Sequence, residues 1–130
     1  MNIFLINEKS FFCPMELTME VIGGKWKLLI LFQLQTNGAR RYGELRSALA
    51  GITHKMLTQQ LRELEEFGII HREVHQVVPP KVEYWLTERG ERLIPVLQAM
   101  SDWGSSFGVE RTEEKPTTKK SKQKTSLKSA

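Results

Sequence analysis

The chain has 130 residues, a formal net charge of +4 and 40% hydrophobic side chains, which suits one globular domain with a modest core. Its single cysteine excludes an internal disulfide, and no stretch is long and apolar enough to span a bilayer. The short apolar run near the N-terminus lacks the basic flank of a secretion signal. We therefore expect a cytoplasmic protein that does not enter a membrane.

The positive charge is unevenly distributed. Residues 1–108 hold 12 basic and 12 acidic side chains, whereas residues 109–130 hold 7 basic and 3 acidic ones. Within the neutral part, one acidic residue accompanies five basic ones between positions 40 and 62, namely Arg40, Arg41, Arg46, Lys55 and Arg62. This local cluster, rather than the overall charge, is typical of a surface that binds nucleic acid.

The N-terminal half predicts two helices after an N-terminal extension, residues 1–12. Proline is favoured at the first helical position, so Cys13-Pro14 begins a helix that Gly23-Gly24 ends. The apolar run at 25–34 predicts a central buried helix, with a strand as the competing interpretation. Residues 39–41 are expected to form a short strand.

Two short amphipathic helices follow, joined by a tight turn at residues 50–52. The first contains Tyr42, Leu45 and Leu49. The second, at about 53–67, has Thr53 as its N-cap and places Leu57, Leu61 and Leu64 on one apolar face. Its other face carries His54, Lys55, Thr58, Gln59 and Arg62, side chains that suit base edges and phosphates. A merely solvated polar face is the alternative.

After Gly68 the pattern changes to period two, which predicts strands on either side of a hairpin tip at 76–81. Thr87 is then expected to cap a last helix that Pro95 bends or weakens by one hydrogen bond. Together these elements predict an α+β, mostly α fold: a winged helix-turn-helix domain at residues 13–108 with a two-stranded wing. Residues 109–130 hold almost no apolar side chains to bury and are expected to form a disordered basic tail.

Several blocks of sequence resemble one family. They are Cys13-Pro14, 23–27 (GGKWK), 42–46 (YGELR), 55–64 (KMLTQQLREL) and 78–84 (VPPKVEY). In order and spacing they are similar to the HxlR-type (MarR-like) winged helix-turn-helix transcriptional regulators. The resemblance implies a homodimer that binds double-stranded DNA operators, with its N- and C-terminal helices at the dimer interface. The residues expected there are Met15, Met19, Leu97, Met100, Trp103 and Phe107.

The expected DNA-binding residues lie in three places. The recognition helix supplies Thr53, His54, Lys55, Thr58, Gln59 and Arg62, of which Gln59 suits adenine and Lys55 or Arg62 suits guanine or phosphate. The wing supplies Arg72 and Lys81, for phosphate or the minor groove, unless these charges are only solvated. The remaining candidates are Arg41, Lys25 and its neighbour Lys27, whereas Trp26 is expected in the core.

Cys13 is a candidate redox sensor. The partial positive charge at a helix N-terminus stabilises the thiolate, which is the nucleophilic form. Some members of the resembled family sense oxidants or electrophiles with a cysteine at this position. The alternative is a small buried hydrophobic residue.

The sequence predicts no enzymatic activity, cofactor or metal site. His54, His71 and His75 are not spaced as a metal-binding set, and no nucleophile elbow or phosphate loop is present. Two other functions remain open: a winged-helix module that binds protein, and a regulator gated by a small aromatic ligand. The effector is not predicted.

Overall fold

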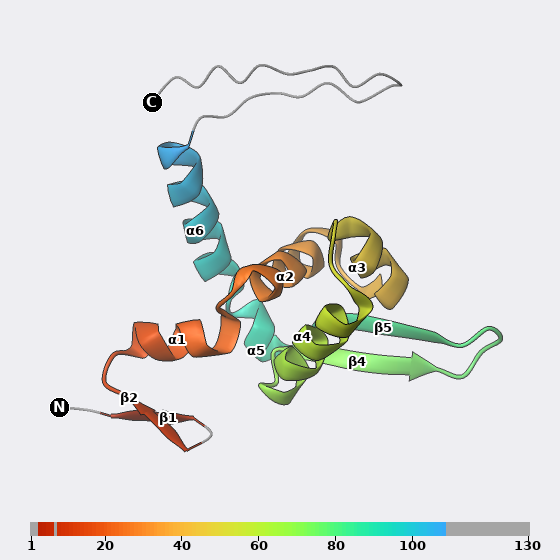
Figure 1. Cartoon of the computed structure of the whole chain (residues 1–130), viewed down its shortest axis with the longest axis horizontal. Helices are drawn as coiled ribbons and strands as arrows, with labels where there is room; N and C mark the ends of the chain where they lie inside the picture. The colour runs from red at the N-terminus through yellow and green to blue at the C-terminus, as the bar shows by residue number, and fades with distance from the viewer. Residues whose placement is uncertain (1–2, 7, 109–130) are drawn as a thin grey trace. The chain divides into compact units, whose positions relative to one another are not determined.

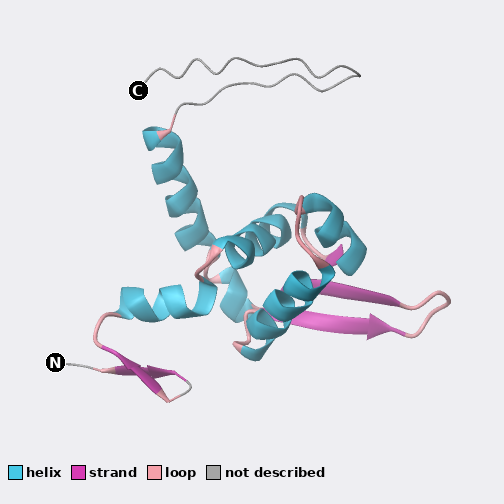
Figure 2. Cartoon of the chain, in the orientation of Figure 1, coloured by secondary structure: helices cyan, strands magenta, loops and turns pink. Residues whose placement is uncertain are grey.

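The computed structural model describes residues 3–6 and 8–108. In chain order the elements are β1 (Phe4–Ile6), β2 (Lys9–Phe11), α1 (Pro14–Ile22), α2 (Lys25–Asn37), β3 (Arg40–Arg41), α3 (Tyr42–Ala48), α4 (His54–Glu66), β4 (Ile70–His75), β5 (Lys81–Leu86), α5 (Glu88–Glu91) and α6 (Ile94–Phe107). Figure 2 shows that helices dominate the described chain. The chain divides into two units, Met1–Ile94 and Pro95–Ala130. The expected tail, 109–130, lies outside the described residues.

Helices α2, α3 and α4 form the body of the first unit. Each of them contributes apolar side chains that are almost fully buried: Ile30 and Leu31 of α2, Leu45 of α3, and Leu57, Leu61 and Leu64 of α4. The turn from α3 to α4 passes through Gly51, whose φ of 87° is a conformation that residues with a Cβ rarely adopt. Burial of the leucine face fixes which side of α4 points outward, so the helix-turn-helix arrangement is confirmed.

The wing is a three-stranded antiparallel sheet in the order β3-β5-β4. Arg72 pairs with Tyr84 and His75 with Lys81 across the hairpin, while Arg41 pairs with Glu83 on the other side of β5. Figure 1 shows the hairpin end projecting away from α2, α3 and α4. The predicted strands and the turn containing Pro79-Pro80 are confirmed, except that Lys81 begins β5 instead of lying in the tip.

Two features of the chain ends differ from expectation. Residues 4–6 and 9–11 form a small hairpin, β1–β2, where only an extension was expected, because strands of three residues are too short to show a period. The prediction of a single helix after Thr87 is wrong. Thr87 caps the four-residue α5, and a new helix, α6, begins at Ile94. Pro95 has no N–H to continue the first helix and suits the first turn of the second.

Helix α2 is less completely buried than its sequence indicates. Leu29 and Phe32 are exposed and Trp26 is half-buried, because the helix presents only one side to α4 and the sheet. Lys27, in contrast, is buried, with 7% of its surface exposed. No described helix is long and apolar enough to cross a membrane.

Candidate nucleic-acid interface

Helix α4 begins with a well-formed cap. The Thr53 hydroxyl accepts a hydrogen bond from the Met56 backbone N–H at 3.0 Å, which satisfies one of the free donors of the first turn. Since the leucine face is buried, the other face of the first two turns is directed outward. Of the expected recognition residues, Thr53, His54, Lys55, Gln59 and Arg62 are exposed and Thr58 is half-buried.

The phenol of Tyr42 connects α3 to α4. The Oη of Tyr42, at the start of α3, lies 2.5 Å from Nδ1 of His54 and 3.5 Å from Oγ1 of Thr58. The Tyr42 and His54 rings meet edge to face, with 5.4 Å between their centroids. His54 and Thr58 are therefore held from the α3 side, which sets the orientation of the first two turns of α4.

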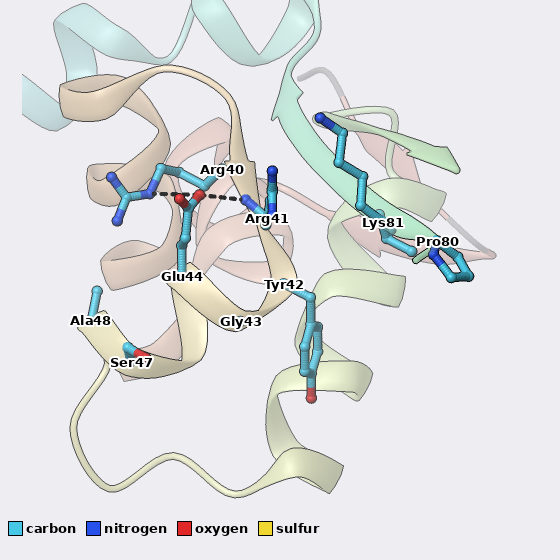
Figure 3. A pocket seen from close by; sticks show the side chains of 10 residues that line it. Arg40, Arg41, Tyr42, Gly43, Glu44, Ser47, Ala48, Pro80 and Lys81 are labelled. Atoms are coloured by element: carbon cyan, nitrogen blue, oxygen red, sulfur yellow. Dashed lines mark hydrogen bonds and ion pairs between the residues drawn. The ribbon is translucent and has the colours of Figure 1, made fainter. Parts of the chain in front are cut away.

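A hollow of about 970 Å³ lies between the start of α3 and the first residues of β5, next to the hairpin tip. Its lining includes the cationic residues Arg40, Arg41 and Lys81, so we call it the basic hollow. In Figure 3 the Arg41 and Lys81 side chains extend to the same side, whereas the Tyr42 ring extends away from them. The hollow is open and has the charge that a DNA phosphate requires.

Glu44 organises the basic hollow. One of its oxygens accepts from the Arg41 backbone N–H at 2.8 Å and lies 3.7 Å from Nε of Arg40. The hydrogen bond from Arg41 and the nearby charges of Arg40, Arg41 and Lys81 hold the pKa of Glu44 below its usual value, against a smaller opposing effect of burial. Glu44 thus engages the Arg40 side chain and the Arg41 backbone, as the dashed lines in Figure 3 show.

A second hollow of about 310 Å³ separates α4 from the wing. It is lined by Thr58, Leu61, Arg62, Glu65, Arg72 and Tyr84. Tyr84 is buried, and this burial raises the pKa of its phenol. The phenol is therefore neutral, and the two arginines give this side of α4 a net positive character. Basic side chains thus lie directly beside α4 at this hollow, and the basic hollow reaches the start of α4 only through Tyr42, which contacts His54.

The interior of the motif contains an ion pair that the sequence did not reveal. Lys27 of α2 donates to Oε1 of Glu63 at 2.5 Å and to Oε1 of Gln60 at 3.1 Å. The expectation that Lys27 meets DNA phosphate is therefore wrong, because its ammonium group is turned into the fold. Lys25 is exposed, and its Nζ lies 4.5 Å from the centre of the Trp26 ring.

Glu63 also has a partner on the outer side of α4. Its second carboxylate oxygen, Oε2, accepts from Nε2 of Gln59 at 3.2 Å. The hydrogen bond from Lys27 is the largest of the effects that hold the pKa of Glu63 below its usual value, and burial opposes it. The exposed amide of Gln59 is thereby connected to the buried ammonium group of Lys27.

The histidines of the wing pair with carboxylates. His71 Nε2 lies 2.9 Å from Glu73 and His75 Nε2 lies 2.8 Å from Glu83. The His71 hydrogen bond lowers the pKa of Glu73. Among residues 3–6 and 8–108, no group of three histidine, cysteine or acidic side chains is arranged to hold a metal ion.

Comparison with known proteins identifies the family. The model of the HxlR-like helix-turn-helix family matches residues 21–112. The HTH-type transcriptional regulator YdeP of Bacillus subtilis is 54% identical over 95 residues, which is 73% of each chain. The chain belongs to the HxlR family. It is a DNA-binding transcriptional regulator of the helix-turn-helix type and not an enzyme.

Solved structures of related regulators have the same fold. The redox regulator HypR in its oxidised form is 50% identical, with a TM-score of 0.68, over 78% of this chain and all of the HypR chain. The reduced form of the regulator YodB from B. subtilis is 38% identical, with a TM-score of 0.65, over 75% of this chain and 95% of YodB. The winged helix-turn-helix fold of this HxlR-family member is thereby confirmed.

Cys13 of this regulator is exposed and unpaired, at the N-cap position of α1. In the single chain, Cys13 is therefore not buried. The same helix exposes Met15 and Met19. In the second unit, α6 exposes Met100, Trp103 and Phe107, the last two with stacked rings 5.2 Å apart, while Leu97 is buried.

Sequence reasoning missed three residues of the candidate interface. The sequence identifies Tyr42 only as a position of the first helix and Arg40 only as part of a basic cluster, and it assigns no role to Glu63. The pairing of Tyr42 with His54 depends on how α3 crosses α4, a tertiary relationship. For Glu63, the spacing of four residues from Gln59 was a usable signal, because such pairs lie side by side on a helix.

Proposed function

We propose that this regulator binds a pseudo-palindromic operator as a homodimer, with α4 of each subunit in a major groove. The supporting observation is helix α4 itself, whose outer face is exposed and polar. Arg62 and Arg72 line the hollow beside it, and its first residue, His54, contacts Tyr42 at the edge of the basic hollow. In a helix-turn-helix dimer, such an arrangement requires half-sites separated by about one or two turns of DNA. We further propose that it acts in the cytoplasm.

The roles of the individual side chains follow from their chemistry. Gln59 has an amide suited to adenine, and Lys55 and Arg62 suit guanine or phosphate. Thr53, His54 and Thr58 surround the start of α4 and suit the sugar-phosphate backbone. Arg41 and Lys81 from the basic hollow, Arg72 from the wing, and Lys25 from α2 are assigned to phosphates.

The apolar side chains of α1 and α6 support the dimer. Met15 and Met19 are at least half exposed, as are Trp103 and Phe107. Exposed aromatic and methionine side chains are enriched at protein interfaces, and two stacked rings present a large apolar area to water. We assign these residues, with Met100, to contacts between two copies of the chain. Leu97, which was expected there, is already buried within the single chain and is not assigned to the interface.

Redox control through Cys13 is the proposed regulatory signal. HypR is described as a redox regulator, and Cys13 in this chain is exposed at the start of α1. An oxidant that accepts two electrons and two protons from two Cys13 thiols would leave a disulfide between subunits. Because α1 is assigned to the dimer interface, that bond would change the spacing of the two recognition helices.

The decisive experiment is a salt-resolved titration of the reduced protein with the DNA upstream of its own gene and with a scrambled duplex. We expect a clear preference for the specific duplex, with affinity falling steeply as salt rises. Gln59→Ala should reduce this preference, whereas Lys55→Ala should weaken binding to both duplexes. Equal weak binding to genomic fragments of every sequence would contradict the proposal and favour a protein-binding module.

A further inference from the structure

Lys27 is the only buried charged residue in the described part of the chain. Its side chain is 9% exposed, and an ammonium group at such a position is unfavourable unless an opposite charge and hydrogen bonds compensate. Both compensating groups, Glu63 and Gln60, come from α4. The lysine therefore holds a carboxylate of the recognition helix in a fixed place.

The two oxygens of the Glu63 carboxylate have different partners. Oε1 accepts from Lys27 on the inner side of α4, and Oε2 accepts from Gln59 on the outer side. The ammonium group lowers the pKa of Glu63, so the group is an acceptor at neutral pH. The Glu63 side chain is 37% exposed, but its contact with Lys27 gives the carboxylate a defined place from which Oε2 accepts the Gln59 hydrogen bond.

The orientation of the Gln59 amide follows from this contact. Only the NH₂ group can donate to a carboxylate, whereas the amide oxygen would be repelled by it. With the nitrogen toward Glu63, the oxygen points away, and one N–H remains free. An oxygen and an N–H match the N6 amino group and N7 of adenine, whereas guanine presents two acceptors, O6 and N7, at the same edge.

We propose that Glu63, anchored by Lys27, is a positioning residue that fixes the Gln59 amide for adenine and against guanine. This inference rests on the proposed function, in which Gln59 reaches a base edge. The ion pair thereby has a role in specificity in addition to its role in the fold. Lys27 and Glu63 act through Gln59 and need not touch DNA.

The test is a selection of bound sequences from randomised duplexes with the wild type, Gln59→Ala and Glu63→Gln. We expect the wild type to favour adenine over guanine at one position of each half-site by roughly 5- to 150-fold, the range of a bidentate contact. Glu63→Gln should lose most of that preference because its neutral amide accepts Gln59 in either orientation. Glu66→Gln, which removes an exposed charge in the same helix, is the matched control and should keep the preference.

A second measurement uses the wild type alone, in case Glu63→Gln does not fold. Replacing the selected adenine by a purine without the 6-amino group should weaken binding by about 2- to 10-fold, the effect of one hydrogen bond. Unchanged affinity for this duplex would overturn the inference, as would an unaltered adenine preference in folded Glu63→Gln. If Gln59→Ala keeps the adenine preference, the contact between Gln59 and the base is refuted, and with it the premise of this inference.

Discussion

The hydroxyl of Tyr42 lies 2.5 Å from Nδ1 of His54, so the first residue of α3 holds the first residue of α4. Tyr42→Phe keeps the ring contact and removes the hydrogen bond. We expect the free energy of unfolding to fall by about 1 kcal/mol and DNA affinity to fall by a few fold, because a neutral hydrogen bond contributes about 0.5–1.5 kcal/mol. Thermal melting and titration with DNA measure the two effects.

A double-mutant cycle separates this contact from general damage. His54→Ala should be less harmful in the Tyr42→Phe background than in the wild type, because the contact is already absent. Strict additivity of the two substitutions would show that the two side chains act independently.

The pH dependence of stability should contain a contribution from Glu63. Lys27 holds the pKa of this carboxyl below its ordinary value of 4.5, so the folded state binds its proton less readily than the unfolded chain does. The stabilisation is therefore complete above about pH 4.5 and is lost as the pH falls through the lowered pKa. Urea denaturation from about pH 7 to about pH 3 should show the difference between wild type and Glu63→Gln shrinking toward acid. A constant difference over this range would refute the assignment, since Glu44 and Glu73 titrate in both proteins.

The basic hollow should contribute to the salt dependence of DNA binding. Arg41→Ala and Lys81→Ala are each expected to weaken binding to specific and scrambled duplexes alike, and to reduce the slope of log affinity against log salt by about 1. Lys9→Ala is the matched control, because Lys9 lies outside the hollow and pairs with Glu20. A slope that stays unchanged in both hollow variants would place these cations away from phosphate.

Trp103 and Phe107 should determine the oligomeric state. Trp103→Ala removes a ring that is 66% exposed in the single chain, and we expect sedimentation to shift from dimer toward monomer at equal concentration. Ser105→Ala, on a different side of α6, should leave the dimer intact. If Trp103→Ala sediments like the wild type, α6 does not carry the interface through this side chain.

Cys13 should determine the response to thiol oxidants. Diamide is expected to alter DNA binding by the wild type and to produce a disulfide-linked dimer on a non-reducing gel. Cys13→Ser should bind DNA as the reduced wild type does and should not respond. A response of normal size in Cys13→Ser would exclude this residue as the sensor.

Much of the fold was predictable because local chemistry dominates it. The Thr53 cap, the leucine face of α4 and the change to period two after Gly68 are each properties of a few neighbouring residues, and the structure confirms them. The burial of Lys27 was not predictable in this way. A lysine in the first turn of a helix is ordinarily exposed, and its partner, Glu63, lies 36 positions later in the chain.

The break between α5 and α6 illustrates a different limit. The proline at position 95 was recognised as unfavourable inside a helix, but periodicity alone does not decide between a bent helix and two separate ones. The pairing of Tyr42 with His54 and the grouping of Arg41 with Lys81 likewise depend on how β3, β5 and α3 meet. The sequence therefore predicted the recognition helix well and the residues that orient it poorly.

The tip of the wing, residues 76–80, consists of Gln, two Val and two Pro, so it carries no charge, and Val78 is 98% exposed there. A contact made by uncharged side chains displaces no counterions from DNA, whereas each contact by Arg41 or Lys81 does. The two parts of the interface should therefore respond differently to salt. As salt is raised, the arginine and lysine contacts weaken, while any contribution of the tip to the affinity persists. At high ionic strength, the remaining affinity would measure how well these valines and prolines fit the surface of the duplex.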